Sequence, residues 1–279
     1  MIFPEKLKIG DKIGIISPAR KITLNELDPA IKTIESWKLK VELGSNLFEV
    51  DNQFSGTIEQ RSTDLQTMID DDSIKAILCA RGGYGTVQII DNIDFSKLKN
   101  NPKWIVGYSD ITVVHEKLHK LGYQSIHGMM CINLVEKPSL IKLSLETLKS
   151  ALFGELEGYK VKGSHYNKIG SASGKLVGGN LSLITATLGS KTSLITKGKI
   201  IFIEEIGEYK YHIDRMLQSL KRAGYFENLK GLLVGDMSKM RKNTTLWGTS
   251  VEQLILEALS EYDFPITFNM PAGHEKDNR

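Results

Sequence analysis

The sequence is poor in cysteine and in long apolar runs. Its two cysteines, Cys79 and Cys131, lie in apolar segments, where thiols usually act as small hydrophobic side chains. The first apolar run, Ile13–Ile16, is far too short to span a bilayer, and charged residues interrupt the segment before it. We therefore expect a cytoplasmic protein with no cleavable signal and no membrane partner.

The sequence also has no large excess of positive or of negative charge. The 36 lysines and arginines nearly balance the 33 aspartates and glutamates, which leaves a formal net charge of +3. No stretch concentrates basic residues as a nucleic-acid-binding surface does. The 279 residues are 41% hydrophobic and 25% charged, a composition typical of a soluble globular protein with one large domain or two ordinary ones. We therefore expect no nucleic-acid partner.

In the first half of the chain, short β-branched runs alternate with helical patterns. Strands are expected over residues 12–17, 39–43, 73–80 and 104–106, and helices over residues 28–37, 57–70 and 111–121. Asp28 is the expected cap of the first helix, with Pro29 in its first turn. The alternation predicts a doubly wound, mostly parallel sheet of the Rossmann or flavodoxin type, whose ligands bind at the carboxyl ends of strands.

A second domain is expected after a stretch without hydrophobic periodicity. Residues 154–170 are rich in Gly and Lys and have the character of a linker. Beyond them, strands are expected over 199–203 and 231–235, and helices over 180–188 and 213–223. We therefore predict an N-terminal α/β domain over residues 1–160 and a smaller C-terminal α/β domain over residues 161–279.

A serine follows the strand expected at 104–106. The segment Gly107-Tyr-Ser-Asp110 resembles the nucleophile elbow Gly-x-Ser-x-Gly, with Ile111 in place of the second glycine. Such a turn lifts the serine hydroxyl out of the sheet and aims backbone N–H groups at a developing oxyanion. Serine is also a favoured helix cap, so these residues alone leave Ser109 either as a nucleophile or as a cap.

A glycine-rich loop, Arg81-Gly-Gly-Tyr-Gly85, follows the strand expected at 73–80. Its glycines permit close backbone approach, so that N–H groups can converge on an anion. The spacing matches neither a Walker loop nor a dinucleotide-binding fingerprint. A plain tight turn is the alternative.

A nucleophilic serine needs a base, and the sequence offers six histidines. His127 and His274 each follow an apolar stretch and adjoin glycine, as residues of site loops do. His115 and His119 share a helix face, but no third metal ligand accompanies them, so we expect no metal. The other two, His165 and His212, lie in the expected linker and in a charged segment.

An acid that orients the base is expected at the end of the strand at 199–203, where Glu204 and Glu205 follow. A carboxylate at the end of a buried strand is costly unless it has a partner. At least one of the two is therefore expected to contact an imidazole or a cation. A salt bridge to Arg215 on the next helix is the structural alternative.

Taken in order, these segments resemble the LD-carboxypeptidase family, the serine peptidases that include muramoyl-tetrapeptide carboxypeptidases and microcin C self-immunity peptidases. No single segment is decisive, and their common order makes the resemblance specific. The segments are residues 7–18, 81–85, 106–112, 127–129, 178–181, 203–208, 211–216, 233–235 and 273–274.

The resemblance implies a Ser–Glu–His triad that falls on Ser109, Glu204 and His274. Glu204 is preferred to Glu205 because it matches the first acidic residue after the family's strand. The serine would lie on the N-terminal domain and the other two residues on the C-terminal one, so that the triad would form across a cleft. The chain ends at Arg279, five residues after His274, whereas family members usually continue through a further segment, so a truncated C-terminus is one expectation.

The resemblance also implies an oxyanion hole and a binding loop. The backbone N–H groups of Asp110 and of Gly83, or its neighbour Gly82, would hold the oxyanion. Arg81, Gly82 and Tyr84 are candidates for substrate binding, with Arg81 gripping a terminal carboxylate. Pairing of Arg81 with an acid of its own fold is the alternative.

The implied activity is that of a cytoplasmic serine carboxypeptidase. It would hydrolyse the L,D-peptide bond before the terminal D-alanine of murein tetrapeptides in peptidoglycan recycling, as a homodimer and without a cofactor. One alternative is an immunity-type peptidase that cleaves peptidyl or aminoacyl adenylates. The other is a non-catalytic α/β protein whose glycine loop binds a nucleotide or another anion.

Overall fold

The computed structural model describes residues 1–158 and 160–279, and the contacts divide the chain into two compact units. Unit 1 contains Met1–Glu157 together with Lys276–Arg279, and unit 2 contains Gly158–Glu275. The last four residues thus group with the first unit, whereas the sequence placed everything after residue 160 in the second. Within unit 1, the Ser144 hydroxyl donates to the carbonyl of Lys276 at 3.1 Å and accepts the N–H of Asn278 at 2.8 Å.

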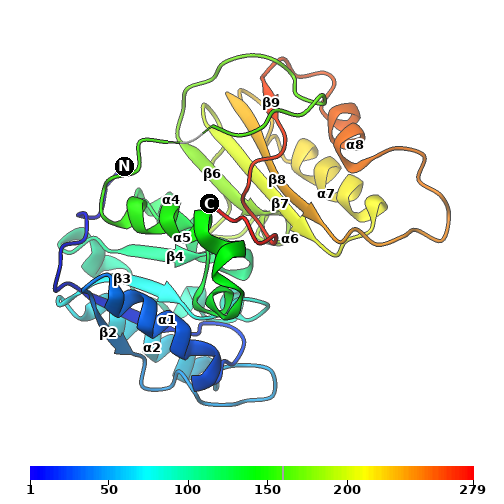
Figure 1. The fold of residues 1–279 in the computed structure, drawn as a ribbon. Coiled ribbons are helices and arrows are strands. Elements are labelled where there is room, and N and C mark those ends of the chain that lie inside the picture. Colours follow the sequence, from blue (N-terminus) through cyan, green and yellow to red (C-terminus); the bar gives the residue numbers. More distant parts are fainter. Residues whose placement is uncertain (159) are drawn as a thin grey trace. The chain divides into compact units, whose positions relative to one another are not determined.

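Unit 1 contains a five-stranded parallel sheet (Figure 1). Its strand order is β2-β1-β3-β4-β5, which is the flavodoxin-like order. Successive strands are added on one side of β1 and then on the other, so the switch point of the topology lies between β1 and β3. The predicted doubly wound parallel sheet is therefore confirmed. The strands are β1 (Lys12–Ile16), β2 (Lys40–Leu43), β3 (Ile74–Cys79), β4 (Trp104–Gly107) and β5 (Ile126–His127).

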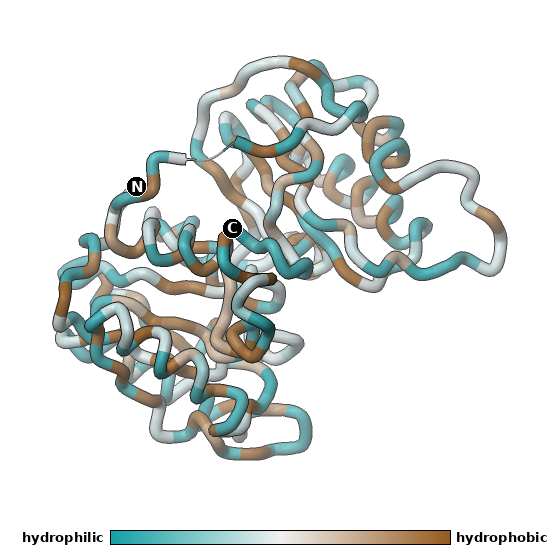
Figure 2. Tube along the Cα trace, in the orientation of Figure 1, coloured by the Kyte–Doolittle hydropathy of each residue, from teal (hydrophilic) through white to brown (hydrophobic). Residues whose placement is uncertain are grey.

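Helices cover both faces of this sheet. Residues of α1 and α5 share an apolar core with Ile13 and Ile15 of β1. Gly14 points to the opposite face, where the Met68 sulfur of α2 lies 2.5 Å from the position of an added Cβ. Figure 2 shows the hydrophobic residues concentrated along the strands and the inner sides of the helices. The helices are α1 (Leu24–Ser36), α2 (Ile58–Asp70), α3 (Thr86–Ile89), α4 (Thr112–Leu121) and α5 (Pro138–Leu152).

The start of α1 corrects a sequence prediction. The helix is capped by Thr23 and not by Asp28: the N–H of Glu26 donates to the Thr23 hydroxyl at 3.3 Å, and the Thr23 N–H donates to the Glu26 carboxylate at 2.9 Å. This capping box satisfies two N–H groups of the first turn. Pro29 therefore lies inside the helix, where it removes one backbone hydrogen bond.

Unit 2 contains a four-stranded parallel sheet in the order β6-β7-β8-β9 (Figure 1). The predicted strands and helices of this half are present, but β6, α8 and β9 were not predicted. Gly178 explains why β6 escaped detection: its φ is +123° and an added Cβ would lie 1.9 Å from the carbonyl oxygen of Phe202, so a glycine typical of turns stands inside a strand. The elements are β6 (Leu176–Asn180), α6 (Leu181–Ala186), β7 (Ile200–Ile206), α7 (Lys210–Arg222), β8 (Gly231–Ser238), α8 (Val251–Ala258) and β9 (Ile266–Thr267).

The pairing of β7 with β8 is interrupted by a bulge. Ile203 pairs with Val234, but Glu205 pairs with Met237. Two residues of β8, at positions 235 and 236, thus lie opposite the single residue Glu204. Bulges re-aim side chains, and this one lies where β7 carries its two glutamates.

Across residues 1–158 and 160–279, none of the helices combines the length and the apolar character that a membrane span requires.

Candidate active site

Ser109 of unit 1 begins the turn between β4 and α4 in a strained conformation. Its φ is +61°, in the left-handed region that residues other than glycine seldom adopt. Ser109–Ile111 form a short 3-10 helix, and Ile111 occupies the position that caps α4. The structure thus does not place Ser109 at the helix cap, and its backbone has the sharp strand-to-helix turn of a nucleophile elbow.

The residue after the serine ties this turn to the glycine loop. Asp110 is 1% exposed, and its carboxylate accepts the N–H of Thr86 at 2.8 Å and the Thr86 hydroxyl at 2.6 Å. Burial raises the pKa of Asp110, while the bonds from Thr86 oppose that shift. Because Thr86 begins α3 immediately after the glycine loop, the side chain of Asp110 fixes the two loops against each other.

The glycine loop passes close to the backbone of the serine turn. An added Cβ on Gly82 would lie 3.4 Å from the carbonyl oxygen of Tyr108 and 3.6 Å from the amide nitrogen of Asp110. Gly83 has a φ of +109°, and an added Cβ there would lie 2.2 Å from Cδ of Arg20. Position 83 therefore requires glycine, and Gly82 brings the loop close to the Asp110 amide.

A buried arginine that the sequence did not single out supports the same loop. The Arg61 guanidinium donates at 3.0 Å to the carbonyl of Gly85 and at 3.0 Å to that of Pro18, which follows β1. It lies 4.7 Å from the centre of the Phe54 ring. Burial lowers the pKa of Arg61, yet an arginine remains charged. This cation fixes the glycine loop against the end of β1.

His115 supports the strand that leads to the serine. Its Nε2 lies 2.8 Å from the carbonyl oxygen of Gly107 and its Nδ1 lies 2.8 Å from the Ser125 hydroxyl. Burial lowers the pKa of His115 to about 4, so the ring is neutral near pH 7. Among the described residues no group of three His, Cys, Asp or Glu side chains is placed to hold a metal ion. His115 therefore serves the fold of the elbow.

The two side chains proposed for substrate binding lie at the start and middle of the loop. Nη1 of Arg81 lies 3.3 Å from Oε1 of Glu26 and 3.3 Å from the carbonyl oxygen of Lys21, which is the pairing within its own fold that the sequence left open. Tyr84 is 48% exposed, and its ring lies 5.9 Å from that of Phe54.

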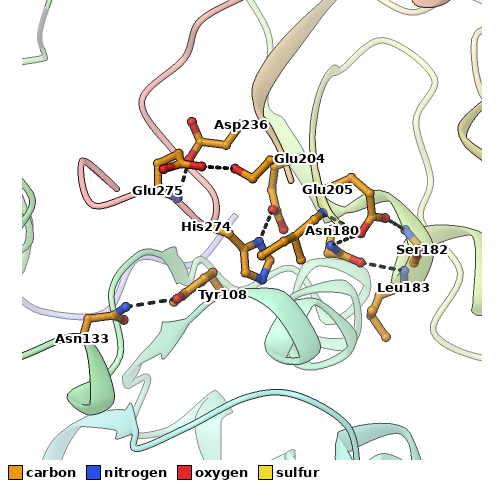
Figure 3. A network of polar contacts seen from close by, with 12 residues as sticks. Tyr108, Asn133, Asn180, Ser182, Leu183, Glu204, Glu205, Asp236, His274 and Glu275 are labelled. Carbon is orange, nitrogen blue, oxygen red and sulfur yellow. Dashed lines mark hydrogen bonds and ion pairs between the residues drawn. The ribbon is translucent and has the colours of Figure 1, made fainter. Parts of the chain in front are cut away.

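In unit 2, Glu204 and His274 form a buried pair (Figure 3). Nδ1 of His274 lies 2.7 Å from Oε2 of Glu204, and the glutamate side chain is 0% exposed. Burial lowers the pKa of His274, but its hydrogen bond to Glu204 and the nearby negative charges outweigh this effect, so the net shift is upward. Burial raises the pKa of Glu204.

Glu205 binds other groups than its neighbour Glu204 does. Its carboxylate accepts the N–H of Ser182 at 2.8 Å and the side-chain amide of Asn180 at 3.1 Å, both at the start of α6 (Figure 3). Successive residues of a strand point to opposite faces, so only Glu204 reaches the imidazole. The geometry therefore favours Glu204 as the acid of the pair.

The other histidines considered as the base, and the arginine considered as a partner of the glutamates, contact other groups. Nδ1 of His212 lies 2.6 Å from Oε2 of Glu208, and the Arg215 guanidinium lies 5.2 Å from the centre of the Tyr211 ring. The His165 ring centre lies 4.0 Å from that of Tyr166, and that of His127 lies 6.1 Å from those of both Tyr108 and His115. His274 is thus the histidine whose carboxylate partner is fully buried.

The described residues include an elbow serine, a glycine loop beside it and a buried glutamate–histidine pair. These are features of serine hydrolases. The family profile of the LD-carboxypeptidase N-terminal domain matches residues 13–128, and that of the LD-carboxypeptidase C-terminal domain matches residues 173–279. The chain belongs to the LD-carboxypeptidase family, as the resemblance of its segments predicted. It is accordingly a hydrolase of the serine-peptidase class.

Named relatives cover almost the whole chain. A probable murein peptide carboxypeptidase of Bacillus subtilis is 37% identical over 275 residues, which are 97% of this chain and 86% of that protein. A murein tetrapeptide carboxypeptidase of Pseudomonas aeruginosa is 27% identical over 97% of this chain and 90% of that protein.

Solved structures show the same fold. The muramoyltetrapeptide carboxypeptidase from Oxalobacter formigenes has a TM-score of 0.81 and 26% identity, and the match covers 96% of this chain and 90% of that one. The microcin C7 self immunity protein MccF in complex with aspartyl sulfamoyl adenosine has a TM-score of 0.83 over 97% of this chain and 90% of that one. At 22% identity, the second likeness concerns the fold alone.

Proposed function

We propose that this protein is a serine carboxypeptidase that removes the terminal D-alanine of murein tetrapeptides by hydrolysing the L,D-peptide bond. The observation that carries the proposal is the 2.7 Å contact between a buried carboxylate and His274, together with the left-handed Ser109 of the elbow. The relatives named for murein peptides, one of them 37% identical to this chain, support the choice of substrate.

In the proposed reaction His274 acts first as a base and then as an acid. Its Nε2 removes the Ser109 proton, and the hydroxyl oxygen attacks the carbonyl carbon of the scissile bond. The imidazolium then protonates the departing amine of D-alanine, and water hydrolyses the acyl-enzyme through the same steps. Glu204 stabilises the imidazolium and fixes Nδ1 as the protonated nitrogen.

The negative charge that develops on the carbonyl oxygen needs donors. The N–H groups of Asp110 and Gly83, or of Gly82 beside it, are proposed to supply them, since a Cβ added to Gly82 would lie only 3.6 Å from the Asp110 nitrogen. Loss of one such donor typically raises the barrier by about 3 kcal/mol. This is why the Asp110–Thr86 bonds matter to the reaction: they hold both donors on one rigid support.

Release of free D-alanine from a purified L,D-tetrapeptide muropeptide tests the substrate. We expect release from the tetrapeptide, and none from the corresponding tripeptide, which lacks the terminal residue. A protein that leaves the tetrapeptide intact but cleaves a peptidyl adenylate would belong to the alternative, immunity-type activity. A protein that cleaves neither and is not labelled by a serine-directed fluorophosphonate would be the non-catalytic binder.

We also propose a cytoplasmic location and a homodimer. The described Cys79 and Cys131 are both free and buried, in keeping with a reducing compartment. Light scattering on the purified chain tests the second point: a particle of twice the 31.2 kDa chain mass is expected, and a monomer at micromolar concentration would contradict it.

A further inference from the structure

The bulge in β8 brings a second acidic residue to the glutamate–histidine pair. Gly235 and Asp236 both lie opposite Glu204, and such a bulge bends the strand and re-aims its side chains. An added Cβ on Gly273 would lie 2.9 Å from Cβ of Asp236 and 3.1 Å from Oε2 of Glu204. The turn that carries His274 therefore packs directly on both acids, and glycine at 273 permits that approach.

The end of β8 holds this turn from both sides. The N–H of Asp236 donates to the carbonyl of Ala272 at 2.9 Å, before His274. Its carboxylate accepts the N–H of Glu275 at 3.0 Å, directly after His274 (Figure 3). The Ser238 hydroxyl adds a 2.6 Å bond to the Glu275 carboxylate. Asp236 thus forms one backbone bond before His274 and one side-chain bond after it, and we call these two bonds the bracket.

Charge adds to this geometric role. The acidic groups around the imidazole are Glu204 and Glu205 of β7, Asp236 of β8, and Glu275 next to Asp236. Asp236 also lines a cavity of about 300 Å³, which Lys239 and Glu252 line as well. Asp236 is thus less enclosed than Glu204, and its negative charge favours the imidazolium.

We propose that Asp236 is the positioning residue of His274: it fixes the turn that carries the imidazole, and its charge stabilises the protonated ring during catalysis. Glu204 orients the ring through Nδ1, and Asp236 orients the backbone from which the ring projects. The part of this inference that concerns catalysis rests on the proposed function. The structural part does not, because the bracket and the charge act on His274 whether or not a murein peptide is the substrate.

Two substitutions separate the bracket from the charge. Asp236→Asn keeps an oxygen that can accept the Glu275 N–H but removes the negative charge. Asp236→Ala removes the charge and the acceptor of the Glu275 N–H, and leaves only the backbone bond to Ala272. Asp263→Asn is the matched control, because it makes the same change of charge in unit 2 at a side chain that is fully exposed.

The first readout is the titration of the His274 ring by NMR in the full chain, with its signal identified by its absence from His274→Gln. Burial raises the pKa of Asp236 to about 6, so its carboxylate is mostly ionised at pH 7 and above. We expect the His274 titration to move to lower pH in Asp236→Asn and to stay unchanged in Asp263→Asn. An unchanged titration in Asp236→Asn would overturn the charge role.

The second readout is kcat and KM for D-alanine release as a function of pH. For Asp236→Asn we expect the acid limb of kcat/KM to move to lower pH, with the maximal kcat within about threefold of the wild type. For Asp236→Ala we expect kcat to fall on the order of 10- to 100-fold with KM little changed, because a displaced base is costly in the transition state. Full kcat in Asp236→Ala would overturn the positioning role.

The two proposals fail in different ways. If the wild type releases no D-alanine while the His274 titration still responds to Asp236→Asn, the substrate proposal fails and the structural role of Asp236 stands. If D-alanine is released and neither Asp236 variant alters kcat or the titration, the positioning role fails and the substrate proposal stands.

Discussion

The carboxylate of Glu204 lies 2.7 Å from Nδ1 of His274, with the glutamate side chain withdrawn from solvent. A charge-assisted bond of this kind is stronger than one between neutral groups. It also selects a tautomer, because an ionised carboxylate can only accept and so requires the proton on Nδ1. Nε2 is thereby left with the lone pair that a general base needs.

Glu204→Gln is expected to reduce kcat by about 10³- to 10⁴-fold, since an amide can present a donor to Nδ1 and then favours the wrong tautomer. The protein should still fold, because glutamine fills the same space without a buried charge. D-alanine release by the purified variant, with its circular dichroism as the check of folding, measures the effect. A loss smaller than tenfold would remove Glu204 from the triad.

Glu205→Gln is the matched test on the neighbouring residue and should act mainly on stability. The variant keeps an acceptor for the Ser182 N–H but loses a charge at the start of α6, where negative charge is favourable. We expect a loss of about 1 kcal/mol in the free energy of unfolding and a kcat within about tenfold of the wild type. Urea denaturation and kinetics together decide this, and a larger loss of kcat than in Glu204→Gln would reverse the assignment of the two acids.

Thr86→Val tests the link between the serine turn and the glycine loop. Valine has nearly the same shape but cannot donate the 2.6 Å bond to Asp110, so the buried carboxylate keeps one donor fewer. We expect a loss of about 1–3 kcal/mol in stability and a fall of roughly tenfold in kcat as the oxyanion donors shift. Thr86→Ser retains the hydroxyl and should behave like the wild type. Equal kcat values in all three proteins would show that the link does not serve catalysis.

The stability of the protein should depend on pH through Asp236. Its pKa is raised from 3.8 to about 6 by burial, so the folded state holds this proton more tightly than the unfolded state does. The stabilisation is complete below about pH 3.8 and is lost as the pH rises through 6. Removing the ionisable group should therefore make Asp236→Asn more stable than the wild type at pH 7.5, by on the order of 1–3 kcal/mol.

Denaturation of both proteins at pH 4 and pH 7.5 measures this difference. The difference between their free energies of unfolding should be small at pH 4 and larger at pH 7.5. A gap that is the same at both values would mean that Asp236 titrates normally in the folded protein.

The architecture of unit 1 could be predicted because its strands are β-branched runs that end in glycine or polar residues, and alternation with helices determines a parallel sheet. The position of Glu204 was predicted for a similar reason: an acid directly after a buried strand needs a partner. Asp236 carries the same signal, since it follows the strand predicted at 231–235. Asp236 was nevertheless not singled out, because nothing in the sequence indicates the bulge that places it opposite Glu204.

Other parts of the site depend on contacts between distant segments. Arg61 lies on α2 and contacts Pro18 and Gly85. From the sequence of this helix alone, it cannot be distinguished from an exposed arginine. The strained φ of Ser109 is likewise a product of tertiary packing, because the tetrapeptide alone fits a helix cap equally well. The order of the family's segments identified Ser109 before the structure, whereas nothing in the sequence singled out Arg61.

D-alanine release from an L,D-tetrapeptide by the wild type and by Ser109→Ala, assayed side by side, tests the central claim most directly. The account predicts release by the wild type and a loss of nearly all of that release in a variant with an unchanged fold, because removal of the nucleophile leaves only residual catalysis. Undiminished release by Ser109→Ala would contradict it.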